Sequence, residues 1–361
     1  MGIFNEIEQF ANDSKILFPI LLSLISAVIF WCFFSYILNK IRYKKIRPII
    51  ELYFYHLHNR LFHLFDMILR HNSFSPSFFQ DKIYSGTLTE YDFNIGLQNK
   101  CLNNTYLYDK FVSKYYDVIG EKLLDIFKDI ENIIEKIINY SEFTNSNELT
   151  LLESLRNDLN KYSLLKEKTI YKDAGQIINN QKYYPVVSNL GYIRKNIFQI
   201  YEKYKQIQKI VFERNSFENR DIAISKVKYF YNTKQYKKCK KFAKKFSKKY
   251  TKDRTLFKFY ETLCEFKLKR KINYNKLDLL LKKYIGSLIS IRSFLKPLLF
   301  DEKFQKLLLK YYSDTEISRL KKVIQDEEDK QKQFYKRNIQ IKNYFEEKDP
   351  RLKMKKNKKD N

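Results

Sequence analysis

The sequence predicts an all-α protein in which one N-terminal transmembrane helix is followed by a helical bundle and by further helical hairpins. Three observations favour this fold class. A long segment near the N-terminus lacks charged residues, apolar residues elsewhere recur at intervals of three and four, and only 7 Gly and 6 Pro occur among 361 residues. Because strands and tight hairpins need frequent turn residues, this composition disfavours all-β and Gly-rich α/β folds.

The uncharged segment is long enough to cross a bilayer. Between Lys15 and Lys40 lie 24 residues without a charge. At about 1.5 Å rise per residue they reach roughly 36 Å, more than the hydrocarbon core of about 30 Å. A cleaved signal peptide and a buried core helix are the alternatives, but the flank is acidic, no A-x-A site follows, and core helices are usually shorter. We expect residues 16–39 to span the membrane.

The charges on either side of this segment predict its orientation. Residues 1–15 hold three acidic residues and one lysine, whereas five basic residues and no acidic one follow the span: Lys40, Arg42, Lys44, Lys45 and Arg47. Basic residues are retained on the cytoplasmic side. We therefore expect a single-pass protein of the cell (inner) membrane, with residues 1–15 outside and the remaining bulk in the cytoplasm. Four widely separated cysteines without a C-x-x-C pair fit a reducing compartment.

Residues 40–172 are expected to form a helical bundle. Pro48 suits the first turn of a helix whose apolar residues run from Ile50 to Ile68 in steps of three and four. A short helix should start near Ser75 and stop at Gly86. The next should start at Thr89, followed by amphipathic helices over 107–139 and 148–162.

The second half is expected to begin after a linker. Residues 173–188 lack helical periodicity and are the best candidate for a domain boundary. Residues 189–312 should form a basic helical region. It starts with a helix whose apolar residues, from Ile193 to Val211, form a seam along one face. Such a seam is more often an intramolecular bundle contact than a dimeric coiled coil, although both remain open.

A long helix over 313–348 and a basic disordered tail over 349–361 are expected to complete the chain. The helix keeps a heptad register, but Glu327, Gln331 and Asn338 occupy seam positions. Because polar seam residues lower stability, an exposed helix packed only at its ends is favoured over a partner-dependent coiled coil. Pro350 follows its expected end.

Positive charge is concentrated in the second half of the chain. Residues 221–361 carry 41 Lys and Arg against 17 Asp and Glu, which accounts for +24 of the net charge of +28. One helix holds apolar residues on one face and eight lysines around the rest: Lys237, Lys238, Lys240, Lys241, Lys244, Lys245, Lys248 and Lys249. A solvated face, a contact with anionic lipid and a contact with nucleic acid all remain open.

A weak family resemblance begins near residue 220. Aromatic residues from Tyr229 to Tyr236 precede a tight turn, and Cys239 and Ala243 punctuate the next helix; a similar pattern returns at Tyr274, 38 residues after Tyr236. This resembles the helical hairpins of tetratricopeptide repeats over about 220–290. The chain departs from the family because Lys234 stands where glycine is common, and the family period is nearer 34. The resemblance implies a stacked-hairpin surface that holds another protein, whereas an ordinary helical bundle is the alternative.

The sequence offers no convincing catalytic or metal site, so we predict no enzyme activity, cofactor or metal. Phosphate-binding glycine loops are missing. All four histidines fall within residues 56–71; His56, His63 and His71 lie within about 80° on one helical face, whereas His58 points the other way. Packing roles are expected for them rather than metal binding. The E-x-K strings at Glu265 and Glu346 lie in helical patterns, unlike nuclease sites.

These features lead to two hypotheses about function. The first is a membrane-tethered cytoplasmic adaptor that binds a protein partner. The alternative is a membrane-attached protein that binds a polyanion, either nucleic acid or anionic lipid, through the lysine-rich helix. Binding that weakens steeply with salt would indicate the polyanion-binding protein, and a salt-tolerant protein complex would indicate the adaptor.

Overall fold

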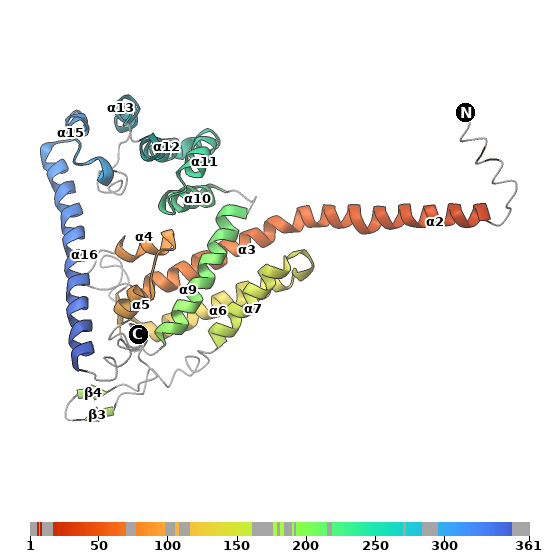
Figure 1. Cartoon of the computed structure of the whole chain (residues 1–361), viewed down its shortest axis with the longest axis horizontal. Helices are drawn as coiled ribbons and strands as arrows, with labels where there is room; N and C mark the ends of the chain where they lie inside the picture. Colours follow the sequence, from red (N-terminus) through yellow and green to blue (C-terminus); the bar gives the residue numbers. More distant parts are fainter. Residues whose placement is uncertain are drawn as a thin grey trace, which may run out of the picture.

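The structure confirms an all-helical architecture, to which two very short antiparallel strand pairs are added (Figure 1). Among the described residues the core is formed mainly by helix side chains. The computed structural model describes residues 6, 8, 17–69, 77–97, 105–107, 116–160, 176–178, 181–183, 190, 193–214, 219–269, 272–283 and 295–348.

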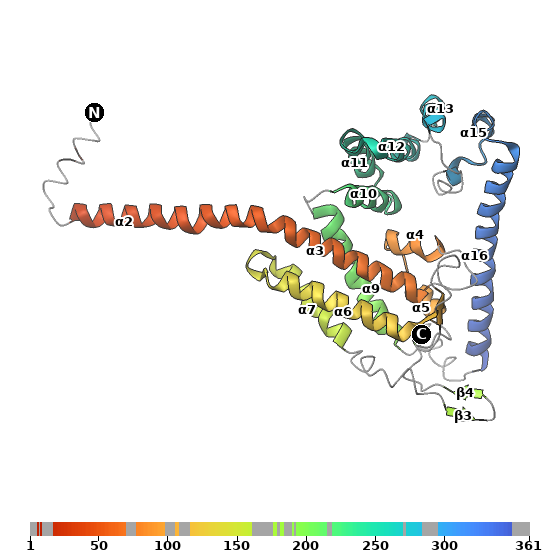
Figure 2. The same ribbon diagram turned by 180° about the vertical axis from the view of Figure 1, so that it is seen from behind.

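The N-terminal half of the longest helix stands clear of the rest of the molecule. Helix α2 (Leu17–Trp31), the π-helical segment η1 (Cys32–Ile37) and α3 (Leu38–Leu69) follow one another without a break. Both views show α2 projecting away from all other helices (Figures 1 and 2). Its apolar side chains are exposed, Trp31 by 66%, and burial begins only at Ile50. This is the one helix of the described residues that is long and apolar enough to cross a membrane, judged by length and composition.

Pro48 lies inside α3, so the expectation that it starts a new helix is wrong. Proline removes one backbone hydrogen bond and normally kinks a helix. Here the residues on both sides are held by tertiary contacts: Arg47 bonds to Glu148, and Ile50 is fully buried. The helix that is expected to cross the membrane and the first helix of the domain are therefore one continuous rod.

Around α3 a bundle forms as the apolar spacing predicts. The α3 residues Phe54, Leu57, Leu61 and Leu64 are buried. The helices that surround them are α4 (Ser77–Ser85), α5 (Glu90–Gly96), α6 (Ile119–Ile138), α7 (Ser146–Asn160), α9 (Arg194–Lys209) and the π-helical segment η5 (Ile210–Arg214). The short 3-10 segment η2 (Ser141–Phe143) joins α6 to α7.

Two helix ends in this bundle follow the predicted chemistry. Gly86 has φ +67° and closes α4, because the left-handed region is readily available only to glycine. Thr89 caps α5 in a capping box: its side chain accepts a hydrogen bond from the Asp92 backbone N–H, and Asp92 accepts one from the Thr89 N–H. The sequence thus correctly located the turn between α4 and α5.

The expected helix over 107–139 is shorter than predicted. It begins at Ile119, because β1 (Thr105–Leu107) and β2 (Tyr116–Val118) pair as antiparallel strands before it. Within the segment expected to be a linker, β3 (Gln176–Ile178) pairs with β4 (Gln181–Tyr183). Each of these strands contains tyrosine or a β-branched residue, the residue types that favour strands.

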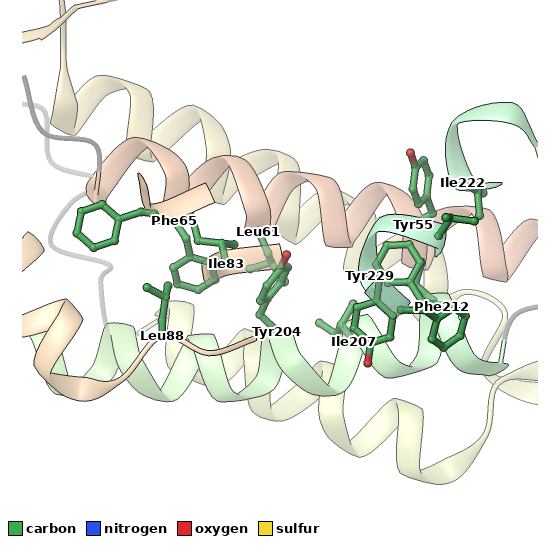
Figure 3. Packing of buried hydrophobic residues seen from close by; sticks show 14 of the residues in the cluster. Tyr55, Leu61, Phe65, Ile83, Leu88, Tyr204, Ile207, Phe212, Ile222 and Tyr229 are labelled. Carbon is green, nitrogen blue, oxygen red and sulfur yellow. The ribbon is translucent and has the colours of Figure 1, made fainter. Parts of the chain in front are cut away.

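Aromatic residues fill the centre of the bundle (Figure 3). Phe65 of α3 meets Tyr201 and Tyr204 of α9 at ring-centroid distances of 5.3 and 5.4 Å. The seam predicted from Ile193 onward lies on this side of α9 and η5, with Ile200, Tyr204 and Val211 buried against α3. The intramolecular alternative for this seam is therefore the observed one.

The second half of the chain is a row of helices packed each against the next. They are α10 (Arg220–Asn232), α11 (Tyr236–Lys249), α12 (Arg254–Lys269), α13 (Tyr274–Lys283) and α15 (Glu302–Leu308), with 3-10 segments η6 (Thr251–Asp253) and η8 (Lys296–Leu298) between some of them. Helix α10 also packs on α4, which joins this row to the bundle.

Helix α16 (Asp314–Lys348) runs along one edge of the domain (Figures 1 and 2). Its first turns bury Ile317, Leu320 and Ile324. Farther along, the Tyr335 hydroxyl donates a hydrogen bond of 2.8 Å to Asp92, and its ring stacks on Tyr91 of α5 at 6.3 Å. The helix thus bridges the C-terminal row and the bundle; the side chains of residues 337–348, at the end that is also expected to pack, lie outside the described ones.

Candidate polyanion-binding face on helix α11

Helix α11 is amphipathic in the way that the sequence predicts. Cys239, Ala243 and Phe246 are fully buried against α10 and α12. Phe242 stacks on Phe230 of α10 at 5.3 Å with the rings 6° from parallel. The eight lysines occupy the remaining circumference, but the structure divides them into two groups with different surroundings.

Four of the lysines have neighbours on the same surface. Lys240 pairs with Glu265 at 2.9 Å, and Lys238 lies 3.9 Å from Glu213. Lys245 and Lys249 lie over the rings of the adjacent Phe246 and Tyr250, at 5.6 and 5.4 Å. These four side chains are therefore partly used in local contacts.

The other four form a row that we call the α11 lysine stripe: Lys237, Lys241, Lys244 and Lys248. All four are exposed, and none has a carboxylate partner among the residues that the structure describes. Their spacing of four, three and four places them within about 60° around the helix, opposite the buried face. The stripe is about 16 Å long at 1.5 Å per residue.

The stripe is unfavourable for the isolated helix. Like charges at i,i+4 destabilise a helix by about 0.2–0.5 kcal/mol per pair, and lysines in the first turn oppose the helix dipole. No side chain caps the N-terminus of α11. Tertiary packing holds the helix instead, so the domain presents a row of cations whose mutual repulsion an anionic ligand would relieve.

A tight turn fixes α11 against α10. The backbone N–H of Gln235 donates to the Phe230 carbonyl at 2.8 Å, and that of Lys234 donates to Tyr231 at 3.1 Å. This is a Schellman motif, in which the residue in the left-handed region is usually glycine. Here it is Lys234, with φ 59°. This is the position at which the comparison with tetratricopeptide repeats expects glycine and the sequence has Lys234.

Two buried cysteines lie under the same hairpins. Hydrogen bonding with Cys264 of α12, together with burial, raises the pKa of the Cys239 thiol. Both cysteines are fully buried and neither forms a disulfide. A thiol whose pKa is raised stays protonated and is a poor nucleophile, so Cys239 serves packing, and Cys264 is buried beside it.

The basic residues after the apolar segment have two kinds of environment. Lys40, Arg42, Lys44 and Lys45 are exposed on the projecting helix. Arg47 instead donates two hydrogen bonds of 2.7 Å to the carboxylate of Glu148 in α7 and lies 3.5 Å from Glu51. Hydrogen bonding to Glu148 raises the pKa of Arg47. Sequence reasoning missed this ion pair because its partners are 101 residues apart.

The histidines lie as the helical spacing predicts. His58 is buried, whereas His56 and His63 face a groove on the other side of α3; His71 lies outside the described residues. Among the described residues no group of three or more His, Cys, Asp or Glu side chains is arranged to hold a metal ion. Both E-x-K strings lie on helices, and Glu265 is occupied by ion pairs with Lys240 and Lys276.

His58 belongs to a buried polar chain. Gln208 Nε2 donates to the Tyr204 hydroxyl at 3.0 Å, and this hydroxyl lies 3.1 Å from His58 Nε2. His58 Nδ1 lies 3.1 Å from Asn59 Oδ1. Because Asn59 Oδ1 can only accept, Nδ1–H donates to it, and the neutral ring therefore accepts at Nε2 from the Tyr204 hydroxyl. Burial lowers the pKa of His58 to about 4, so the ring is neutral at pH 7.

Comparisons with known proteins add no family assignment. No family model matches the chain, and neither the curated proteins nor the solved structures contain a match.

Proposed function

We propose that this chain is a single-pass membrane protein whose cytoplasmic helical domain binds nucleic acid through the α11 lysine stripe. The observation that carries the proposal is the stripe itself: four aligned, exposed lysines without carboxylate partners among the described residues. Membrane attachment and nucleic-acid binding are separate parts of the proposal and have separate support.

Membrane attachment is supported by the exposed apolar helix. Water-exposed side chains such as Leu24, Phe30 and Trp31 would be unfavourable in a soluble domain. Four exposed basic residues follow the apolar segment, which favours a cytoplasmic domain. Since α2, η1 and α3 are continuous, the bilayer would hold the domain through a rod rather than through a flexible linker.

Nucleic acid is favoured over the lipid surface by the placement of α11. In both views the turn between α6 and α7 reaches farther toward the apolar helix than α11 does (Figures 1 and 2). A flat bilayer perpendicular to α2 would meet that turn first. A polyanion in the cytoplasm can approach α11 directly, and each phosphate that a lysine neutralises releases condensed counterions.

The experiment is a salt series on the full chain in nanodiscs of neutral lipid, with duplex DNA and RNA as ligands. Four phosphate contacts predict that log K falls with log salt with a slope of about −3 to −4. Changing the stripe lysines 237, 241, 244 and 248 to glutamine should lower affinity more than tenfold and reduce the slope by about 3. The matched control changes lysines 238, 240, 245 and 249, which removes the same charge.

Two results would overturn the nucleic-acid proposal. One is a lack of binding to either nucleic acid at about 0.15 M salt. The other is an equal loss of affinity in the stripe variant and in its control, which would leave only a general effect of net charge. Binding to nanodiscs that contain anionic lipid, but not to nucleic acid, would show that the ligand of the stripe is the membrane surface.

A second candidate function is a protein-binding adaptor built from tetratricopeptide-like hairpins. It is supported by α10 packing on both α11 and α12, the pattern expected of stacked hairpins, and by the left-handed Lys234 at the turn. Capture of one protein from native membranes that persists at about 0.5 M salt, roughly three times physiological ionic strength, would favour this function. Capture that disappears at that salt would count against it.

A further inference from the structure

A groove separate from α11 lies between α3 and α6. Its volume is about 580 Å³, within the range of small-molecule sites. Its polar lining includes His56, Asn59, Arg60 and His63 from α3 and Asp129, Asn132 and Lys136 from α6. We call it the α3–α6 groove.

The groove contains more hydrogen-bond donors than acceptors. Arg60 and Lys136 are its arginine and lysine side chains, whereas Asp129 is the one carboxylate of the described lining. Arg60 bonds to Asp129 at 3.2 Å, but both side chains are about half exposed, 48% and 44%, so solvent screens the pair. Lys136 lies 5.9 Å over the ring of Tyr53 and has no carboxylate partner among the described residues. The groove therefore has more hydrogen-bond donors than the carboxylate of Asp129 can accept from.

The buried polar chain orients one further donor. Since His58 Nδ1–H donates to Asn59 Oδ1, the oxygen of the Asn59 amide is used on the inner side of α3. Its NH₂ group is then the part of the amide left for the groove that Asn59 lines. Tyr204 supports this direction from the core, because its hydroxyl donates to His58 Nε2 and the neutral ring then carries its proton on Nδ1.

The pKa of His56 also indicates an excess of positive charge in the groove. Burial, and then the positive charges of Arg60 and Lys136, lower the pKa of His56. His56 faces Tyr53, Arg60 and His63 from α3 and Asp129 and Lys136 from α6. A dianion in the groove would offset the two cations, and His56 would then bind a proton more readily.

We propose that the α3–α6 groove binds a small phosphate monoester, with Arg60, Lys136 and Asn59 donating hydrogen bonds to its oxygens. Guanidinium and ammonium groups are the usual donors to phosphate, and the dianion matches a donor-rich site. The proposal does not depend on the α11 stripe, because the two sites share no residue.

A free phosphate ester fits the position of the groove better than a lipid headgroup does. Tyr53 lies 14 residues beyond the expected end of the span at Asn39, or about 21 Å along a continuous helix. Headgroups of the inner leaflet extend only several ångströms beyond the hydrocarbon core of about 30 Å. The ligand should therefore reach the groove from solution.

The test uses the full chain in neutral nanodiscs, with glycerol phosphate as the free phosphate monoester. Calorimetry measures binding, and NMR follows the ring proton of His56 during a pH titration. We expect the pKa of His56 to rise on binding. Arg60→Gln and Lys136→Gln should each weaken binding about tenfold, a typical loss for one charge-assisted contact. Lys128→Gln, an exposed lysine of α6 outside the groove lining, is the matched control.

A second arm distinguishes the source of the phosphate. Nanodiscs that contain phosphatidic acid carry the same monoester on a lipid, and we expect them to leave the titration of His56 unchanged. A shift with phosphatidic acid alone would overturn the inference of a soluble ligand. No shift of His56 with about 10 mM glycerol phosphate, or equal affinities in the Lys136→Gln and Lys128→Gln variants, would overturn the site itself. The NMR measurement on the unaltered chain stands even if a variant fails to fold.

Discussion

Acid should destabilise this domain through one buried histidine. In the folded chain His58 has a pKa of about 4, because burial opposes its charge, whereas an exposed histidine in the unfolded chain has a pKa of about 6.5. Between these values the unfolded state binds the proton and the folded state does not. The free energy of unfolding therefore rises with pH across this window, and the contribution of His58 reaches its full value above about pH 6.5.

The magnitude follows from the two pKa values. Lowering the pH from 7 to 5 should remove about 2 kcal/mol of stability through His58 alone, and the full loss below pH 4 approaches about 3 kcal/mol. Protonation also puts a proton on Nε2, where the ring now accepts from Tyr204. The hydrogen bond would then have to reverse, and the Tyr204 O–H would lose the acceptor that it has in the neutral state.

The assay is urea unfolding of the full chain in neutral detergent, followed by circular dichroism at several pH values from 7.5 to 5. Other groups titrate in this range as well, so the informative quantity is the difference between the unaltered chain and His58→Gln. We expect the variant to be less stable at pH 7 and to lose about 2 kcal/mol less on acidification to pH 5. Equal pH slopes in the two proteins would refute the assignment of a buried neutral His58.

Three further predictions concern single contacts. Lys234→Gly should raise the free energy of unfolding by about 0.5–1 kcal/mol, because relief of the left-handed strain exceeds the entropy that glycine adds to the unfolded chain; a fall in the urea midpoint would contradict the Schellman turn. Arg47→Gln should destabilise by about 3 kcal/mol, since it leaves the buried Glu148 carboxylate unpaired, and the double variant with Glu148→Leu should recover much of the loss. Gly96→Ala should destabilise by about 1–2 kcal/mol, because an added Cβ would lie 2.6 Å from Leu69 Cδ2; an unchanged thermal midpoint would show that α5 and α3 are not so closely packed.

Local chemistry in the sequence predicted several elements accurately. Thr89 with Asp92 predicted the start of α5, and Gly86 predicted the end of α4, because caps and left-handed glycines act within four residues. The opposite directions of His58 and His56 on α3 followed from helical periodicity alone. Such features need no knowledge of distant partners.

The errors occurred where tertiary contacts override local preference. Pro48 favours a helix start, yet α3 continues through it because Arg47 and Ile50 are fixed by the bundle. The predicted helix over 107–139 is shorter because strand pairing precedes Ile119. A sequence pattern registers the preference of each segment but not the contacts that compete with it.

By itself the sequence determined that the chain is helical, that its N-terminal apolar segment is long enough to cross a membrane, and that positive charge gathers in the second half. These properties depend on composition and on intervals of three or four residues. Only the tertiary structure decided which lysines of α11 remain without a carboxylate partner among the described residues. It also brought His56 and Lys136 to one groove, because both outcomes depend on side chains that lie far apart in the sequence.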